Sequence, residues 1–350
     1  MHRCYLCSFI TFVPLLHLKH PLASKNFHAF QSSCACSGAA AVPVGDLCPD
    51  DKKKMACLVP LLVATAAART VIDAHVHITS LTNGVVYPWA APPVPPATCP
   101  CAQPTGTPCG CDWTSVDYAA ATSNLPASTL VFVEVGASPA SWLVEAQWAQ
   151  GLANAGANIG AIVAGAPPSF CAPDNNYTQI AADLDALAAL PLARGIRGSC
   201  LNFSDAAGHG ARVSRLVLLA ARGLSLDVIT PVAVPGIAAA VAALGAAVPP
   251  ATIVLDHVGS PSVKGGAPGV AAWAAALQTI AGGAPNVVVK LGGILQFFKN
   301  ASGVLPGADE TAPFVLGALD AFGFERSLYE GNCEYAAAVA KIPAARKAHN

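Results

Sequence analysis

The run Val71-Ile72-Asp73-Ala74-His75-Val76-His77 is the best single indicator of the fold. It is short and rich in apolar and β-branched residues, and its second half carries polar side chains. Successive residues of a strand point to opposite faces, so Asp73, His75 and His77 are expected on one face. A strand with so apolar a start is typical of a parallel sheet that helices cover from outside.

Seven similar runs follow, and alanine-rich stretches with helical character separate them. Eight apolar strands that alternate with helices predict an α/β protein with a (β/α)8 TIM barrel. An open doubly wound sheet is the alternative, but the Gly-rich phosphate turn that often follows its first strand is missing. The predicted strands are 70–76, 129–135, 158–164, 194–200, 224–230, 251–257, 286–292 and 327–332, and the predicted helices are 140–152, 177–190, 211–222, 237–247, 270–280 and 313–322.

The composition excludes two classes of protein. Charged residues make up 11% of the 350 residues, against about 25% in ordinary soluble proteins. The best candidate membrane span, Val228–Leu255, is interrupted by four prolines, whereas a spanning helix needs about 20 strongly apolar residues. The 19 Lys and Arg residues against 20 Asp and Glu residues leave no basic excess for phosphates. We therefore expect neither an integral membrane span nor a nucleic-acid partner.

The amino-terminal segment differs from the rest. Residues 1–54 have scattered Cys and His residues without periodicity, and they are expected to be a poorly structured extension or a targeting segment. Residues 55–68, preceded by three lysines, have the basic, apolar and small-residue order of a secretory leader. The barrel is expected over 69–350. The protein would be secreted or organellar if this leader is real, and cytoplasmic otherwise, with Met55 as an alternative start.

Thirteen cysteines are present, and Cys99, Cys101, Cys109 and Cys111 form one tight cluster. Local disulfides and a four-thiolate zinc site are both open. Zinc motifs usually separate paired cysteines by two to four residues, so the one-residue spacing favours disulfides.

Polar residues stand where the predicted strands end, which is where barrel enzymes place their catalytic groups. Each one alone is compatible with a structural role. The pair His75 and His77 is more informative, because two adjacent imidazoles on one apolar face are costly to bury without a partner, and a divalent metal is such a partner. The other candidates are Glu134, Arg197, Asp256, His257, Lys290, Glu330 and Asn332.

Six segments in this order resemble a known family: Ile72–His77, Tyr87–Trp89, Arg194–Arg197, Val254–Gly259, Val289–Gly293 and Arg326–Asn332. Over about residues 70 to 340 the chain resembles the amidohydrolase-related, or amidohydrolase 2, branch of the amidohydrolase superfamily. That branch includes sugar-lactone hydrolases and lactonases of aromatic-acid breakdown.

The resemblance implies roles for individual positions. His75, His77 and His257 would be metal ligands or would face an oxyanion, and Arg197 would hold a substrate carboxylate or carbonyl group. The metal would be divalent, with zinc favoured, although some relatives work without a tightly bound metal. Glu134 and Lys290 are expected to bind substrate beside Arg197.

Two departures from the family pattern matter. Asn332 stands where many relatives have an Asp that activates water, and an amide cannot take that proton. Glu330, Glu334 or His257 would have to replace it, or catalysis would be weak. The chain also ends at Asn350, so the barrel is expected to be truncated after its last strand.

The function expected from these residues is hydrolysis of a small lactone or related carbonyl compound. One alternative is a catalytically silent barrel that binds a small carboxylate through Arg197 and Lys290. The other is decarboxylation at the same site. Nearly uncharged helices over 235–247 and 270–281 would be unusual facing water, so a homo-oligomer is also expected.

Overall fold

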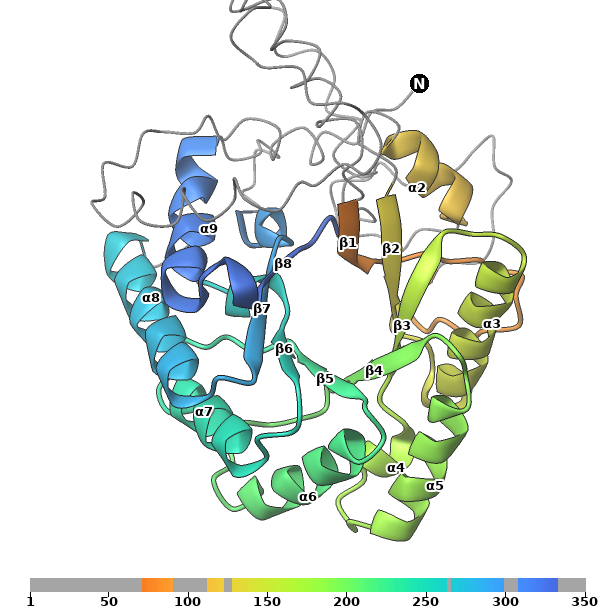
Figure 1. Ribbon diagram of the computed structural model, residues 1–350, viewed down its shortest axis with the longest axis horizontal. Helices are drawn as coiled ribbons and strands as arrows, with labels where there is room; N and C mark the ends of the chain where they lie inside the picture. Colours follow the sequence, from red (N-terminus) through yellow and green to blue (C-terminus); the bar gives the residue numbers. More distant parts are fainter. Residues whose placement is uncertain (1–70, 91–111, 123–127, 263–265, 299–307, 333–350) are drawn as a thin grey trace, which may run out of the picture. The chain divides into compact units, whose positions relative to one another are not determined.

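The computed structural model describes residues 71–90, 112–122, 128–262, 266–298 and 308–332. Eight parallel strands form one sheet in chain order, with helices outside it (Figure 1). The predicted (β/α)8 TIM barrel is thereby confirmed. The strands are β1 Val71–Val76, β2 Ser128–Val133, β3 Ile159–Gly165, β4 Ala193–Arg197, β5 Ser225–Val228, β6 Ile253–Leu255, β7 Val287–Leu291 and β8 Ser327–Tyr329.

All six predicted helices are present, and two short ones, α2 and α4, were not predicted. Helix α2 has a capping box between Thr114 and Asp117, and α4 has only four residues with a proline in its first turn. The helices are α2 Ser115–Ala121, α3 Trp142–Asn154, α4 Pro168–Cys171, α5 Tyr177–Ala188, α6 His209–Ala220, α7 Ile237–Ala247, α8 Gly266–Gly283 and α9 Ala308–Phe322.

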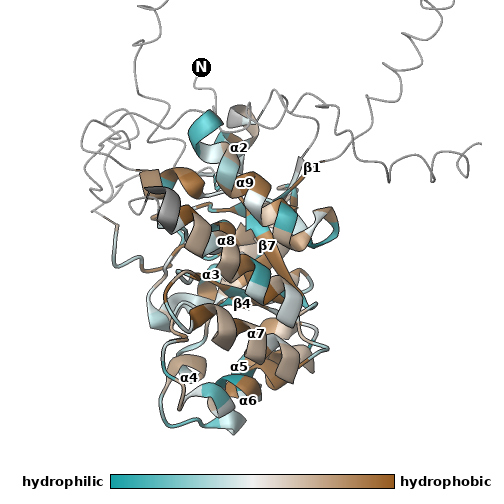
Figure 2. Ribbon diagram, turned by 90° about the vertical axis from the view of Figure 1, so that its left-hand side faces the viewer, coloured by the Kyte–Doolittle hydropathy of each residue, from teal (hydrophilic) through white to brown (hydrophobic). Residues whose placement is uncertain are grey.

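The core lies inside the sheet and between the strands and the helices. Helix α5 illustrates the pattern, because its buried residues Ile180, Leu184 and Leu187 recur at the spacing of one helical face. Burial of each such side chain contributes about 1.5 to 3 kcal/mol. The alanine-rich helices α7 and α8 pack against each other and carry mostly apolar colours in Figure 2. The homo-oligomer stays a prediction.

The gap between the last and the first strand is closed by the segment after β8. The amide of Gly331 donates to Asp73 Oδ1 at 2.8 Å, and the amide of Asn332 donates to the His75 carbonyl oxygen at 2.9 Å. Tyr118 donates to Asp73 Oδ2 at 3.1 Å. A Cβ atom at residue 331 would lie 2.1 Å from Asp73 Oδ2, so only glycine fits there. Asp73 therefore joins β8 to β1.

The predicted strands 251–257 and 327–332 are both too long. His257 and Val258 have φ values of 52° and 49°, and Asn332 has a φ of 46°. These left-handed conformations cannot continue a strand. The backbone therefore leaves the sheet early at β6 and β8, and the polar residues of both segments stand on irregular backbone.

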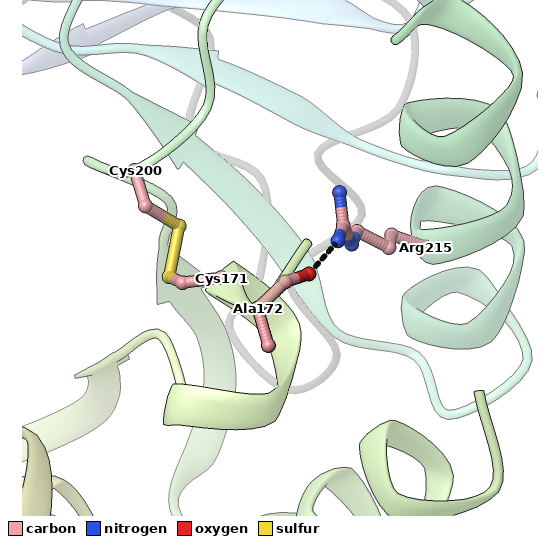
Figure 3. Close-up of a disulfide and its surroundings, with 4 residues drawn as sticks. All are labelled: Cys171, Ala172, Cys200 and Arg215. Atoms are coloured by element: carbon pink, nitrogen blue, oxygen red, sulfur yellow. Dashed lines mark hydrogen bonds between the residues drawn. A yellow bond between two sulfur atoms is a disulfide. The ribbon is translucent and has the colours of Figure 1, made fainter. Parts of the chain in front are cut away.

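One disulfide, which the sequence did not predict, lies within the part of the chain described. Cys171 at the end of α4 is bonded to Cys200 in the loop after β4 (Figure 3). Both cysteines are exposed. Arg215 of α6 fixes the same segment, because its Nη2 atom donates to the Ala172 carbonyl oxygen at 2.7 Å. The loops that follow β3 and β4 are thus cross-linked.

Several predictions fall on residues outside the described ranges: the extension 1–54, the leader 55–68, the cysteine cluster Cys99 to Cys111, Glu334 and the end of the chain. None of the helices within the described residues is long and apolar enough to span a bilayer.

Candidate functional site

The structure brings the predicted site residues together at the carboxyl ends of the strands. The imidazole rings of His75 and His77 have centroids 4.7 Å apart, and those of His75 and His257 are 4.8 Å apart. Histidines from β1 and from the segment after β6, about 180 residues along the chain, therefore meet at one point. The side chains around them are Glu134, Arg197, Asp227, Asp256, Lys290, Glu330 and Asn332.

Hydrogen bonding orients the first two imidazoles. His77 Nδ1 lies 3.0 Å from the Val133 carbonyl oxygen, an acceptor only, so this nitrogen carries the proton and Nε2 carries a lone pair. His75 Nε2 lies 3.1 Å from His77 Nε2. Burial, reinforced by Arg197, lowers the pKa of His77 to about 3. Burial and then Lys290 lower the pKa of His75 well below its usual value. Both rings are neutral at pH 7, which is the form that ligates metals.

The opposite nitrogen of His75 faces charged groups. Its Nδ1 atom lies 3.1 Å from Glu330 Oε1 and 3.6 Å from Asp256 Oδ1. Lys290 Nζ is 3.3 Å away from the same nitrogen. Carboxylates behind one ring nitrogen are the usual support of a histidine that binds a metal through its other nitrogen. The two carboxylates favour a proton on Nδ1, which leaves the Nε2 lone pairs of His75 and His77 facing each other. The Lys290 ammonium, which can only donate, favours a proton on Nε2 instead.

His257 is held by Glu330 in two ways. Its Nδ1 atom contacts Glu330 Oε1, and its backbone amide donates to Glu330 Oε2 at 3.2 Å. A Cβ atom at residue 293 would lie 2.2 Å from His257 Nδ1, so Gly293 is required for the ring to occupy this place. A proton on Nδ1, toward Glu330, would leave the lone pair of the ring on Nε2.

Lys290 is buried within a network of acids. Its Nζ atom lies 2.5 Å from Asp227 Oδ2 and 2.9 Å from Asp256 Oδ1. Burial opposes the charge of Lys290, but Asp227, Asp256 and Glu330 raise its pKa. Burial would also raise the pKa of Asp256, yet Lys290, His75 and Arg197 lower it well below its usual value. Burial outweighs Lys290 at Asp227 and raises the pKa of that group to about 6.

Sequence reasoning missed Asp227. It lies in β5 and is 1% exposed. The signal was available, because Asp227 is the one acid in the apolar predicted strand 224–230. A buried carboxyl group in such a strand needs a partner.

Arg197 and Glu134 form the more accessible part of the site, with side chains 14% and 11% exposed. Arg197 Nε lies 3.5 Å from Glu134 Oε1 and 3.6 Å from Asp256 Oδ2. Arg197 Nη1 donates to the Glu134 carbonyl oxygen at 3.3 Å. The guanidinium is thus oriented by β2 and by the segment after β6.

The residues present fit a divalent cation. His75, Asp256 and His257 can each place one ligand atom within 4.8 Å of the other two. The 3.1 Å between the Nε2 atoms of His75 and His77 also suits two ligands of one zinc ion, whose Zn–N bonds are about 2.0 to 2.1 Å. Asn332 is 2% exposed, and its Oδ1 atom has no hydrogen-bond donor within the described residues.

Comparisons with known proteins agree with the fold. The chain aligns with a solved amidohydrolase from Burkholderia multivorans with bound zinc at 22% identity and a TM-score of 0.56, covering 78% of this chain and 90% of that one. A second structure of that protein, with bound HEPES, gives 20% identity and a TM-score of 0.54 over the same shares.

An amidohydrolase 2 from Bifidobacterium longum subsp. infantis aligns at 22% identity with a TM-score of 0.47, covering 76% of this chain and 84% of that one. A search of curated proteins found no match. The model of the amidohydrolase 2 family, described as amidohydrolase, matches residues 72–333, which is most of the chain. The protein therefore belongs to the amidohydrolase 2 family.

Proposed function

We propose that the protein hydrolyses a small lactone or a related carbonyl compound. The observation that carries the proposal is the cluster of His75, His77 and His257 beside Arg197, with Glu330 behind two of the three rings. This arrangement places a proton acceptor and a cation around one point. Hydrolysis of an ester bond needs both, because water must lose a proton while the carbonyl oxygen gains negative charge.

His75 and His77 would hold a divalent cation through their Nε2 atoms. Asp256 could add a ligand on the side of His75 that it faces. Zinc is the favoured metal, because nitrogen ligands suit it, and the Burkholderia multivorans amidohydrolase is described with zinc. When bound, such an ion supplies a Lewis acid and lowers the pKa of a coordinated water to about 7.

The proposed base is His257. Its Nδ1 atom is held by Glu330, which fixes the tautomer and stabilises the imidazolium that forms when Nε2 takes a proton from water. Asn332 stands where many relatives have an Asp, and its amide cannot accept a proton from water. In this proposal His257, oriented by Glu330, takes over that function. A positioned general base contributes about 10² to 10⁴ to the rate.

Arg197 would bind the carbonyl oxygen or a carboxylate of the substrate, since it is the most accessible cation of the site and Glu134 fixes its orientation. Lys290 has a different role in this proposal. Its ammonium is already held by Asp227 and Asp256, so it balances buried charge and does not contact substrate.

Metal content and turnover of sugar and aromatic lactones, measured on the same preparations, test the proposal. His75→Ala should lose both bound metal and hydrolysis. His257→Asn should keep the metal and lose about 10² or more in kcat, the contribution of a base. An unchanged rate in His75→Ala would remove the mechanism. Release of carbon dioxide would identify a decarboxylase, and ligand binding by a metal-free protein without turnover would identify a silent barrel.

A further inference from the structure

Glu145 is a buried acid close to the site that hydrolysis does not use. It lies in the first turn of α3 and is 1% exposed. Its Oε1 atom accepts a hydrogen bond from the Val135 amide at 3.2 Å. The Tyr87 hydroxyl interacts with the same carboxyl group. A carboxyl group this deeply buried is costly to ionise unless a cation stands beside it.

A single turn connects Glu145 to Arg197. Val135 and Gly136 follow β2, and their consecutive amides donate to the two acids, Val135 to Glu145 and Gly136 to Glu134 Oε2 at 2.6 Å. Trp89 Nε1 donates to the Val135 carbonyl oxygen at 2.6 Å and fixes the turn from the other side. The second oxygen of Glu134 is the one that faces Arg197. Any shift of this turn therefore moves the partner of Arg197.

The charges around Glu145 favour its neutral form. Burial, followed by repulsion from Glu134, raises the pKa of Glu145 to about 8. The Val135 amide, Tyr87 and Arg197 act in the opposite direction but do not compensate. Arg197 already faces the carboxylates of Glu134 and Asp256. A third ionised acid would surround one guanidinium with an excess of negative charge.

We propose that Glu145 is a positioning residue for Arg197: it accepts the Val135 amide in the turn that follows Glu134, and its ionisation draws Arg197 away from an anionic group of the substrate. The functional part of this inference rests on the proposed role of Arg197 as a substrate ligand. The structural part, a link between the protonation of Glu145 and the environment of Arg197, is independent of catalysis.

Nuclear magnetic resonance tests that link. The Arg197 Nε–H resonance, assigned by its loss in Arg197→Lys, should shift between pH 6 and 10 with a midpoint near 8. The labelled Glu145 carboxyl carbon should titrate with the same midpoint. In Glu145→Gln, which mimics the neutral acid, the Arg197 transition should be absent. Glu325→Gln, which changes an exposed acid of the segment Phe324–Arg326, is the matched control and should leave the transition unchanged.

Either of two results would overturn the proposal: a Glu145 carboxyl that titrates below pH 6, or an Arg197 resonance that does not follow it. For an anionic lactone that the protein hydrolyses, KM should rise about two- to threefold from pH 7 to 9. This is the size of effect expected from the one negative charge that ionised Glu145 adds in a high-dielectric setting. Glu145→Gln should abolish this rise. Absence of all turnover would contradict the proposed function and leave the resonance result valid.

Discussion

The candidate functional site has two sides, and their charged side chains lie in different environments. Toward the ends of β5 to β8, Asp227, Asp256, Lys290 and Glu330 have side chains at most 2% exposed, and Lys290 pairs with Asp227 and Asp256. After β2 and β4, Glu134 and Arg197 remain 11% and 14% exposed. The buried side sets the charge and orientation of the histidines, and the open side can meet a substrate. Mutations on the two sides should therefore separate stability from activity.

The largest expected effect is on the buried side. Lys290→Met leaves Asp227 and Asp256 without their cation, and breaking a buried ion pair costs about 3 to 5 kcal/mol of unfolding free energy. Chemical denaturation measures this cost. The exposed Arg194→Met is the control and should change stability by less than about 0.5 kcal/mol. An unchanged denaturation midpoint in Lys290→Met would show that the network does not hold this side together.

A second prediction concerns the open side, where a covalent bond stabilises the loops. Replacement of both Cys171 and Cys200 by Ser removes a cross-link with a sequence separation of 29. The chain-entropy relation gives a loss of about 3 to 4 kcal/mol for such a loop. Thermal unfolding of the reduced, alkylated protein should match that of the double variant. If kcat falls as well, the loops after β3 and β4 also position catalytic groups.

A third prediction follows from the raised pKa of Glu145, about 8 in the folded protein. Below pH 4.5 both states are protonated, and burial of the neutral acid costs little. Between pH 4.5 and 8 only the unfolded state ionises, so this group lowers stability as pH rises, by up to about 1.4 kcal/mol per pH unit. Glu145→Gln should therefore gain stability relative to wild type over that window. A pH-independent difference in denaturation midpoints would contradict this.

The smallest expected effect concerns Asn332. Asn332→Asp supplies a carboxylate next to the histidines and should raise lactone hydrolysis by up to about tenfold. This is less than the full 10² to 10⁴ of a general base, because His257 would already accept a proton in the proposed mechanism. The ratio of kcat values at fixed metal content measures the gain. Should the variant lose activity, the added charge would have disturbed the balance on the buried side.

The sequence predicted all eight strands because buried parallel strands are continuous apolar runs, and these stand out in a chain of this composition. Its errors at the ends of β6 and β8 have a local cause. His257, Val258 and Asn332 adopt left-handed backbone conformations that periodicity does not reveal. Asp227 is visible in the sequence as a single acid in an apolar strand. Its role was missed because its partner Lys290 lies 63 residues away in the chain.

Two further features of the molecule could not be predicted from the sequence and are visible only in the structure. The Cys171–Cys200 disulfide joins the loops after two neighbouring strands, and pairing of distant cysteines cannot be deduced from spacing. The role of Glu330 as the support of His75 and His257 requires knowledge of which ring nitrogen faces it. The sequence predicted which residues gather at the site, but not which of them face substrate and which balance charge.

X-ray absorption at the zinc edge of the purified, zinc-loaded protein tests the central claim most directly. If the cation lies at the histidine cluster, the nearest shell consists of nitrogen and oxygen at about 2.0 to 2.1 Å, and His75→Ala removes the bound zinc. A sulfur shell at about 2.3 Å that survives in His75→Ala would place the zinc on cysteines instead. That result would contradict the proposed metal-assisted site.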